Sequence, residues 1–194
     1  MNTDLDFFSF TRRYLLSLNE VFDESLLESI KALALAINDV WDTNKKLYIC
    51  GNGGSAANAI HIANDFHFGI GCCQGKDSRK YGVRVEALSS NPAILTCLAN
   101  DLGYEYIFSN QLRVNANSGD LLLVLSGSGN SPNIVNALST ASEMNMVTSA
   151  IVGFDGGIAK KLANIPIHAN INDMQISEDV QLIIGHLCMQ FLSR

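Results

Sequence analysis

The chain has 194 residues, of which 47% are hydrophobic and 16% are charged, and its formal net charge is −6 at pH 7. This length fits one domain with a substantial buried core. The negative charge and the lack of a Lys/Arg cluster argue against a nucleic-acid surface, so an anionic ligand needs locally placed donors.

The cysteines and the N-terminus predict a cytoplasmic protein. Five cysteines, an odd number with no CxxC spacing, suit a reducing compartment. The N-terminus has neither the basic start nor the apolar middle of a signal peptide. No apolar run approaches the roughly 20 residues that a membrane-spanning helix needs, so we expect no membrane association.

Two amphipathic helices are predicted first along the chain. Apolar residues recur at helical spacing from Leu5 to Asn19 and again from Ser25 to Asp42. Such helices can cover a sheet or pack on a second subunit, and the sequence does not separate these uses.

From Lys46 onward, short apolar runs alternate with helical ones, which is typical of βαβ units and a parallel sheet. The expected strands are Leu47–Cys50, Val83–Leu88, Leu121–Leu125, Ser149–Val152 and Ile165–His168. A last helix ends the chain, and the helices expected between the strands are Ser55–Phe66, Asn91–Ala99, Ser131–Met144 and Ile158–Ala163. The predicted fold class is α/β, a three-layer sandwich with a five-stranded parallel sheet flanked by helices. We expect a single domain over residues 1–194, with N-terminal helices over 1–44 and the α/β core over 45–194.

The segment from Gly69 to Gly82 has no periodicity and is predicted to be a loop. Its cations Lys76, Arg79 and Lys80 could form a lid over an anionic ligand, or the segment could be a solvated connection. Both readings stay open.

One strand–loop–helix pattern occurs twice in the sequence: an apolar strand, a loop of Gly, Asn and Ser, and then a helix. It appears as LYICGNGGSAANAIHIA and as LLVLSGSGNSPNIVNALS. Glycines let the backbone approach an oxyanion, serines donate hydrogen bonds, and the helix adds free N–H groups and its positive dipole end. Each loop alone could be a tight turn, but together they predict a phosphate cradle at a topological switch point. Neither loop has the GxGxxG or GxxxxGK[ST] spacing, which disfavours ATP-driven chemistry.

Two histidines are candidates for a metal or acid/base site. His61 and Asp65 lie four residues apart on a predicted helix, so they could share a metal, act as an acid/base pair, or form an exposed helix contact. His186 stands in an apolar run. It is either a core histidine whose nitrogens are hydrogen-bonded or a site residue. Glu178 and His186 on one helix would be about 12 Å apart along its axis. Both can bind one zinc only if the chain bends or two subunits contribute, and we expect a site completed at an interface.

Together these residues resemble the SIS (sugar isomerase) domain family, and within it the bacterial phosphoheptose isomerases. The resemblance covers nearly the whole chain from Lys46 onward and weakly the N-terminal helices. The motifs that carry it are CGNGGSAANAIHIA at Cys50–Ala63, LANDLGYEYIF at Leu98–Phe108, SGSGNSPN at Ser126–Asn133, GFDGG at Gly153–Gly157 and LIIGH at Leu182–His186.

The resemblance implies an aldose–ketose isomerase that converts sedoheptulose 7-phosphate to D-glycero-D-manno-heptose 7-phosphate for heptose-containing surface polysaccharide such as lipopolysaccharide. It implies a homotetramer with active sites between subunits. It also implies one zinc per site, held by His61, Asp65, Glu178 and His186, with Asp65 and His186 as the catalytic pair. The implied substrate contacts are Asn52, Gly53, Gly54, Ser55, Asn100, Asp101, Ser126, Gly127, Ser128, Ser131 and Glu178.

Three positions depart from the family pattern, which usually has Glu at Asp65, Gln at Glu178 and Thr at Gly127. Asp65 reaches one methylene less far, which favours its role as a ligand over its role as a base. Glu178 adds an anion, which should bind zinc more strongly and make the site less electrophilic.

Two other functions fit the sequence. One is isomerisation of a different phosphosugar, which the departures at the metal positions leave open. The other is a non-catalytic SIS module that senses a sugar phosphate or docks on another protein. Relatives that associate with the replication initiator act in this second way, but they generally lack the histidine that this chain has at His186.

Overall fold

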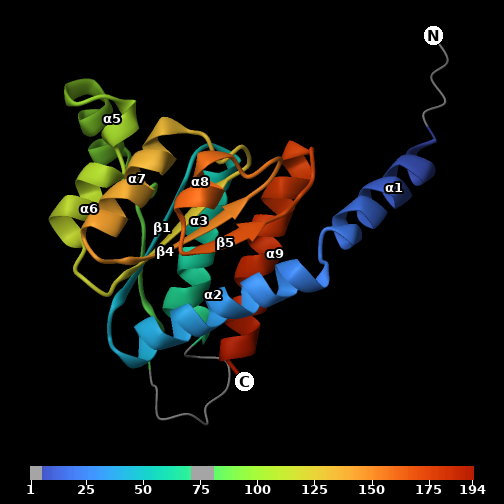
Figure 1. The fold of residues 1–194 in the computed structure, drawn as a ribbon, viewed down its shortest axis with the longest axis horizontal. Coiled ribbons are helices and arrows are strands. Elements are labelled where there is room, and N and C mark those ends of the chain that lie inside the picture. The colour runs from blue at the N-terminus through green and yellow to red at the C-terminus, as the bar shows by residue number, and fades with distance from the viewer. Residues whose placement is uncertain (1–5, 71–80) are drawn as a thin grey trace.

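A parallel sheet of five strands in the order β2-β1-β3-β4-β5 forms the middle layer of the molecule (Figure 1). The computed structural model describes residues 6–70 and 81–194, so the loop cations considered above as a lid lie outside the described residues. The strands are β1 (Lys46–Gly51), β2 (Arg84–Ala87), β3 (Leu121–Ser126), β4 (Val147–Val152) and β5 (Ile165–His168).

Helices cover both faces of the sheet, which confirms the predicted α/β sandwich. On one face lie α2 (Glu24–Asp42), α3 (Gly54–Asn64) and α9 (Met174–Leu192). On the other lie α5 (Pro92–Asp101), α6 (Ser109–Asn115), α7 (Pro132–Glu143) and α8 (Gly157–Leu162). The sequence did not predict α6, which has seven residues and no side-chain cap and is too short for a periodic pattern.

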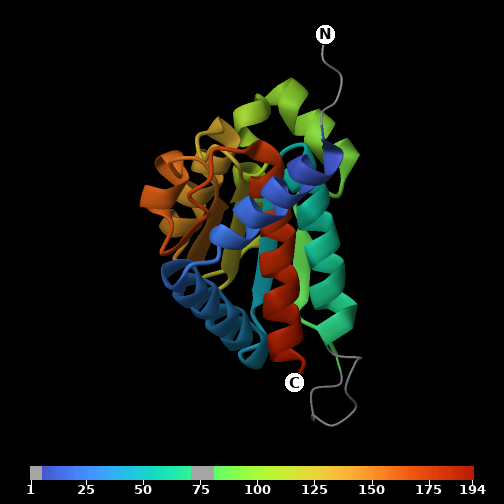
Figure 2. The ribbon, with the colours of Figure 1, turned by 90° about the vertical axis from the view of Figure 1, so that its right-hand side faces the viewer.

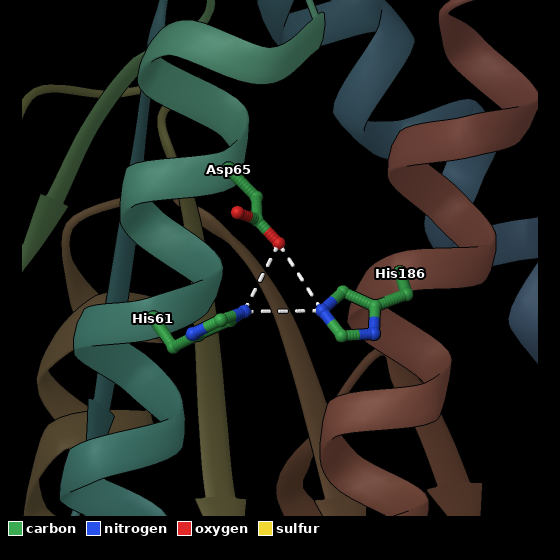
Figure 3. Close-up of side chains that lie close together, drawn as sticks. All are labelled: His61, Asp65 and His186. Atoms are coloured by element: carbon green, nitrogen blue, oxygen red, sulfur yellow. Dashed lines mark hydrogen bonds and ion pairs between the residues drawn. The ribbon is translucent and has the colours of Figure 1, made fainter.

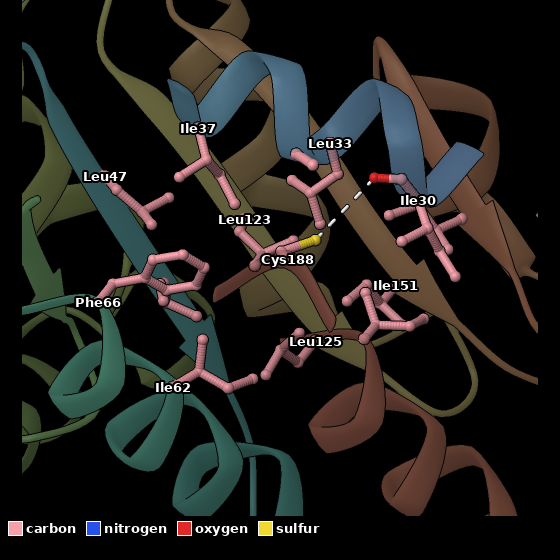
Figure 4. Close-up of a cluster of buried hydrophobic side chains, with 14 of the residues drawn as sticks. Ile30, Leu33, Ile37, Leu47, Ile62, Phe66, Leu123, Leu125, Ile151 and Cys188 are labelled. Atoms are coloured by element: carbon pink, nitrogen blue, oxygen red, sulfur yellow. Dashed lines mark hydrogen bonds between the residues drawn. The ribbon is translucent and has the colours of Figure 1, made fainter. Parts of the chain in front are cut away.

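The strands are apolar on both sides because both faces of the sheet are covered. Along β1, Leu47 and Ile49 point into the core beneath α2, α3 and α9, whereas Tyr48 and Cys50 point into the core beneath α6 and α7. Figure 4 shows the first of these cores, where side chains from the three helices interlock over the sheet. This dense packing fixes where α3 and α9 lie, and the candidate site is built on these two helices.

The chain leaves the sheet in opposite directions after its two central strands. β1 is paired with β3, and the helix after β1 covers one face while the helix after β3 covers the other. Their connecting loops therefore diverge at the carboxyl edge of the sheet and leave a crevice between them. This strand order has its topological switch point between β1 and β3, where ligands bind in open α/β folds.

Helix α1 (Phe7–Glu20) projects from the body of the molecule (Figure 1) and lies beside the first part of α9 (Figure 2). None of its residues is fully buried, although Tyr14 and Leu18 pack against the core. The Tyr14 hydroxyl donates to Oδ2 of Asp179 at 2.6 Å, and this bond ties α1 to α9. Among the described residues, no helix combines the length and apolar character needed to cross a bilayer.

The tie between α1 and α9 predicts an unusual titration of Tyr14. The hydrogen bond to Asp179, with smaller effects of burial and the same negative charge, raises the pKa of Tyr14 from an ordinary 10.0 to about 12. A raised pKa favours the protonated phenol, so the bond contributes its full stability below pH 10 and loses it as the pH rises toward 12.

We expect Tyr14 to titrate near pH 12. Subtracting the phenolate absorbance of Tyr14→Phe from that of the wild type isolates this residue, because the other tyrosines contribute equally to both proteins. A midpoint near pH 10 would show that α1 is not held by this bond in solution.

Candidate functional site

The two Gly-Ser loops line one cleft of about 300 Å³ at the carboxyl edge of the sheet. The start of α9 closes one side of it, with Met174 and Glu178. Nine of the residues implied as substrate contacts line this cleft: Asn52, Gly53, Gly54, Ser55, Ser126, Gly127, Ser128, Ser131 and Glu178. The two loops, which are far apart in the sequence, therefore meet at one cleft, as the repeated strand–loop–helix pattern predicted.

The helices that follow the two Gly-Ser loops, α3 and α7, lack a side-chain cap. Gly53 precedes α3 at a φ of 55°, a left-handed conformation that glycine adopts without strain, and Ser131 precedes α7. The first N–H groups of a helix have no partner within the helix, and they carry its positive dipole end. These two helix starts suit an oxyanion such as phosphate.

The serine hydroxyls of the second loop remain able to donate. Ser126 Oγ accepts a hydrogen bond from the Gly129 N–H at 3.1 Å, and Ser128 Oγ accepts from the Asn130 N–H at 3.3 Å. A hydroxyl that accepts in this way still has its own proton to give. The backbone therefore orients both oxygens while their O–H groups stay available to an anion.

A pair of asparagines joins the two loops directly. Asn52 Nδ2 donates to Asn133 Oδ1 at 2.9 Å, Asn133 Nδ2 donates to Asn52 Oδ1 at 2.8 Å, and the Tyr104 hydroxyl donates to Asn52 Oδ1 at 2.9 Å. These bonds fix the spacing of the two helix N-termini. Sequence analysis gave no role to Asn133 or Tyr104, although both stand in motifs that carry the family resemblance.

A second cluster lies further along α3 and α9 and contains two imidazoles and a carboxylate (Figure 3). His61 Nε2 and His186 Nε2 are 3.1 Å apart, and Asp65 Oδ2 lies 3.4 Å from the first and 3.2 Å from the second. The His186 side chain is 39% exposed, so it is not sealed in the core. The structure therefore brings together three of the four residues implied as metal ligands.

Asp65 owes its position to a local change of helix type. It ends α3 and begins η1 (Asp65–Gly69), a single π-helical turn in which the Ile70 N–H bonds to the Asp65 carbonyl. Such turns are frequent at functional sites. Asp65 Oδ2 faces both imidazoles, and the second oxygen points away from them (Figure 3). His67, on the same π-helical turn, is exposed and is not part of the cluster.

The chemistry of this cluster fits a divalent cation. Two imidazole nitrogens and one carboxylate oxygen all lie within 4.8 Å of one another. Nitrogen and carboxylate oxygen are zinc ligands, and catalytic zinc sites commonly have three protein ligands and an open position. His61, Asp65 and His186 could therefore hold such an ion without a large movement of the chain.

Glu178 lies in the cleft and not in the histidine cluster. Helix α9 is continuous from Met174 to Leu192, so Glu178 and His186 are about 12 Å apart along its axis. The Glu178 carboxylate sits over Gly54, where an added Cβ would lie 2.4 Å from Oε2. Without a bend in α9, Glu178 does not reach the His61–Asp65–His186 cluster of its own chain.

Asn100 and Asp101 lie apart from both the cleft and the cluster. They end α5, are exposed, and Asn100 Nδ2 donates to Asp101 Oδ1 at 2.7 Å. Neither residue lines the cleft described above.

Between the cleft and the cluster, a polar contact joins α3 to α9. Asn58 Nδ2 donates to the Glu178 carbonyl at 2.9 Å and to Gln181 Oε1 at 3.2 Å. Gln181 is fully buried within an otherwise apolar run, and this is the sequence signal that could have revealed the contact. Cys50, buried just before the first loop, is not a nucleophile, because burial raises the pKa of its thiol and keeps it protonated.

Comparison with known proteins identifies the family of the chain. The model of the SIS domain family matches residues 10–153. Phosphoheptose isomerase of Aneurinibacillus thermoaerophilus is 35% identical over 169 residues, which cover 85% of this chain and 80% of that protein. Phosphoheptose isomerase of Synechocystis sp. is 34% identical over 183 residues, which cover 92% and 89%.

Solved structures extend the likeness to three dimensions. Phosphoheptose isomerase from Neisseria gonorrhoeae superposes with a TM-score of 0.85 at 25% identity, over 95% of both chains. A phosphoheptose isomerase from Francisella tularensis gives a TM-score of 0.86 at 23% identity, over 99% of this chain and 98% of that one, and supports the fold alone. The chain therefore belongs to the SIS domain family and groups with its phosphoheptose isomerases.

Proposed function

We propose that this protein is an aldose–ketose isomerase that converts sedoheptulose 7-phosphate to D-glycero-D-manno-heptose 7-phosphate, for heptose-containing surface polysaccharide. The observation that carries the proposal is the placement of an anion cleft and a His-Asp-His cluster along one pair of helices. The phosphate binds at the start of α3 and α7, and the reacting carbons lie at the cluster.

The spacing of the two parts suits a long sugar phosphate. Gly54 and His61 are seven residues apart on α3, which places the cleft and the cluster about 10 Å from each other along the helix. With carbon–carbon bonds of about 1.5 Å, an extended seven-carbon phosphate spans roughly 9 Å from phosphorus to C2. Binding of the remote phosphate in the cleft positions the reactive end of the sugar at the cluster.

The isomerisation moves a proton between C1 and C2 through an enediol. A base removes a proton from C1 while the C2 oxygen gains one, and a proton is then returned to C2 as the C1 hydroxyl loses its own. The second oxygen of Asp65, which points away from the imidazoles, transfers the carbon-bound proton. His186 exchanges the oxygen-bound proton through an imidazole nitrogen.

A zinc ion held by His61, Asp65 and His186 would supply Lewis acidity toward the carbonyl oxygen. Glu178 has a different role in this scheme, because its carboxylate lies in the cleft, where it contacts the sugar phosphate. Asn100 and Asp101, which do not line the cleft between the two Gly-Ser loops, contact substrate bound by a neighbouring subunit.

We further propose a cytoplasmic homotetramer in which each chain, residues 1–194, is a single SIS domain. Helix α1 supports this assembly, because its apolar side chains are largely exposed: Phe8 is 73% and Leu15 is 57% exposed. An isolated helix of 14 residues is only marginally stable in water, so α1 requires a partner surface.

The central test is conversion of sedoheptulose 7-phosphate within a panel of ketose phosphates, with and without a chelator. We expect aldose phosphate from the seven-carbon substrate, a sharp loss of rate with chelator, and loss of turnover in His186→Gln with little change in melting temperature. His67→Gln is the matched control and should retain activity, because His67 lies outside the cluster. Turnover of a different ketose alone, or ligand binding without any turnover, would replace this function with one of the alternatives.

Removal of the charge at Glu178 should strengthen anion binding in the cleft. Two like charges about 4 Å apart near a protein surface repel by up to about 4 kcal/mol, so Glu178→Gln should bind inorganic phosphate more tightly, by a factor on the order of ten. Zinc affinity should not change, because Glu178 is about 12 Å from His186.

Calorimetric titration measures both affinities. Asp179→Asn is the matched control, since it removes a charge one residue away that faces Tyr14. Weaker zinc binding in Glu178→Gln would place this side chain on the metal.

The exposed face of α1 should be required for assembly. Phe8 and Leu15 are seven residues apart and lie on one side of the helix. We expect the double variant Phe8→Glu, Leu15→Glu to have a smaller mass than the wild type by light scattering, and Asn19→Glu to assemble normally. Equal masses for all three proteins would show that α1 does not form the interface.

A further inference from the structure

Helices α3 and α9 pack closely beside the histidine cluster, where Gly185 faces Ile62. We propose that Gly185 is a positioning residue for the metal ligands, because its missing side chain lets α9 come close enough for His186 to meet the short Asp65. This inference rests on the metal site proposed above, and it adds a residue that makes that site possible.

The contact leaves no room for a side chain on α9. A Cβ added at Gly185 would lie 2.6 Å from Cγ1 and 2.9 Å from Cδ1 of Ile62. Ile62 is fully buried in the core shared by α2, α3 and the sheet (Figure 4), so it has little freedom to move away. An alanine at position 185 must therefore push α9 from α3.

The backbone does not require glycine at this position. Gly185 lies inside α9 and is not one of the described glycines with positive φ. Glycine in a helix interior is less favourable than alanine, because it loses more backbone freedom on folding. The helix alone would be more stable with alanine, and the space next to Ile62 is the physical reason for glycine.

The contact between Gly185 and Ile62 lies next to the proposed metal ligands in the sequence of both helices. Gly185 precedes His186, and Ile62 follows His61 and lies three residues before Asp65. His186 Nε2 is 3.2 Å from Asp65 Oδ2, a separation that depends on the distance between the helices. Relief of the overlap needs a shift on the order of 1 Å, whereas metal–ligand distances tolerate only about 0.2 Å.

The other end of this helix pair is held independently. Asn58 bonds to Glu178 and Gln181 of α9, so that part of the pair stays together when the contact at Gly185 is disturbed. We therefore expect a local effect on the cluster and little effect on the anion cleft.

The test measures the affinity of the purified metal-free protein for zinc, by competition with a chromophoric chelator, and for inorganic phosphate. Gly185→Ala should lower zinc affinity by roughly 10- to 100-fold, the range seen for residues that orient metal ligands. Phosphate affinity and the far-ultraviolet circular dichroism spectrum should not change. Gly69→Ala is the matched control, because the nearest described atom to its added Cβ belongs to Met189 of α9, at an ordinary 3.8 Å.

A second variant separates positioning from general damage. Adding Asp65→Glu to Gly185→Ala supplies one more methylene of reach across the widened gap, and should recover most of the lost zinc affinity. Loss of folding in Gly185→Ala does not produce this recovery, so the rescue tests the geometry itself.

The possible failures are distinguishable. Wild-type zinc affinity in Gly185→Ala, an equal loss in Gly69→Ala, or no recovery in the double variant overturns the role of Gly185. If His186→Gln binds zinc as tightly as the wild type, the proposed metal site is wrong, and the role of Gly185 with it.

Discussion

The packing of α3 against α9 is the contact on which both parts of the site depend. One end of this helix pair borders the anion cleft, where Glu178 lies over Gly54. The middle is joined by Asn58, and the far end carries His61, Asp65 and His186. Helices in van der Waals contact behave as rigid bodies, so their spacing sets the distance between phosphate grip and reacting carbons.

The sheet supplies the second half of the cleft. Because β1 and β3 are adjacent and their helices leave on opposite faces, the second loop meets the first at the switch point. The reciprocal amide bonds between Asn52 and Asn133 then fix the two loops to each other. The two helix starts at this edge offer local donors to an anion, as the proposed function requires of a chain whose overall charge is negative.

Two acidic side chains bear on the proposed function. Asp65 is short, and in our proposal the absence of a side chain at Gly185 lets His186 approach it. Glu178 carries a negative charge in the cleft, so in the proposed scheme it weakens the grip on phosphate and favours its release.

The sequence by itself determined the fold class, the five strands and the family. These follow from local patterns: apolar runs of strand length, helical periodicity, and loops of Gly, Asn and Ser between them. It also named the loop residues and the histidines, because their residue types carry the chemistry. Whether Asp65 and His186 act as the catalytic pair stays a prediction, as does the contact of Asn100 and Asp101 with substrate.

Only the tertiary structure decided which of these residues meet. His186 lies beside His61 and Asp65, and Glu178 lies in the cleft. Asn58 and Asn133 make hydrogen bonds that join these parts, and Gly185 packs against Ile62 between the two helices. Such contacts join residues up to about 125 positions apart, and they depend on differences of about an ångström in the separation of packed helices, which is itself about 8–10 Å. Periodicity along the chain records which face of a helix is apolar, but the distance between two packed faces is set by the side chains of both.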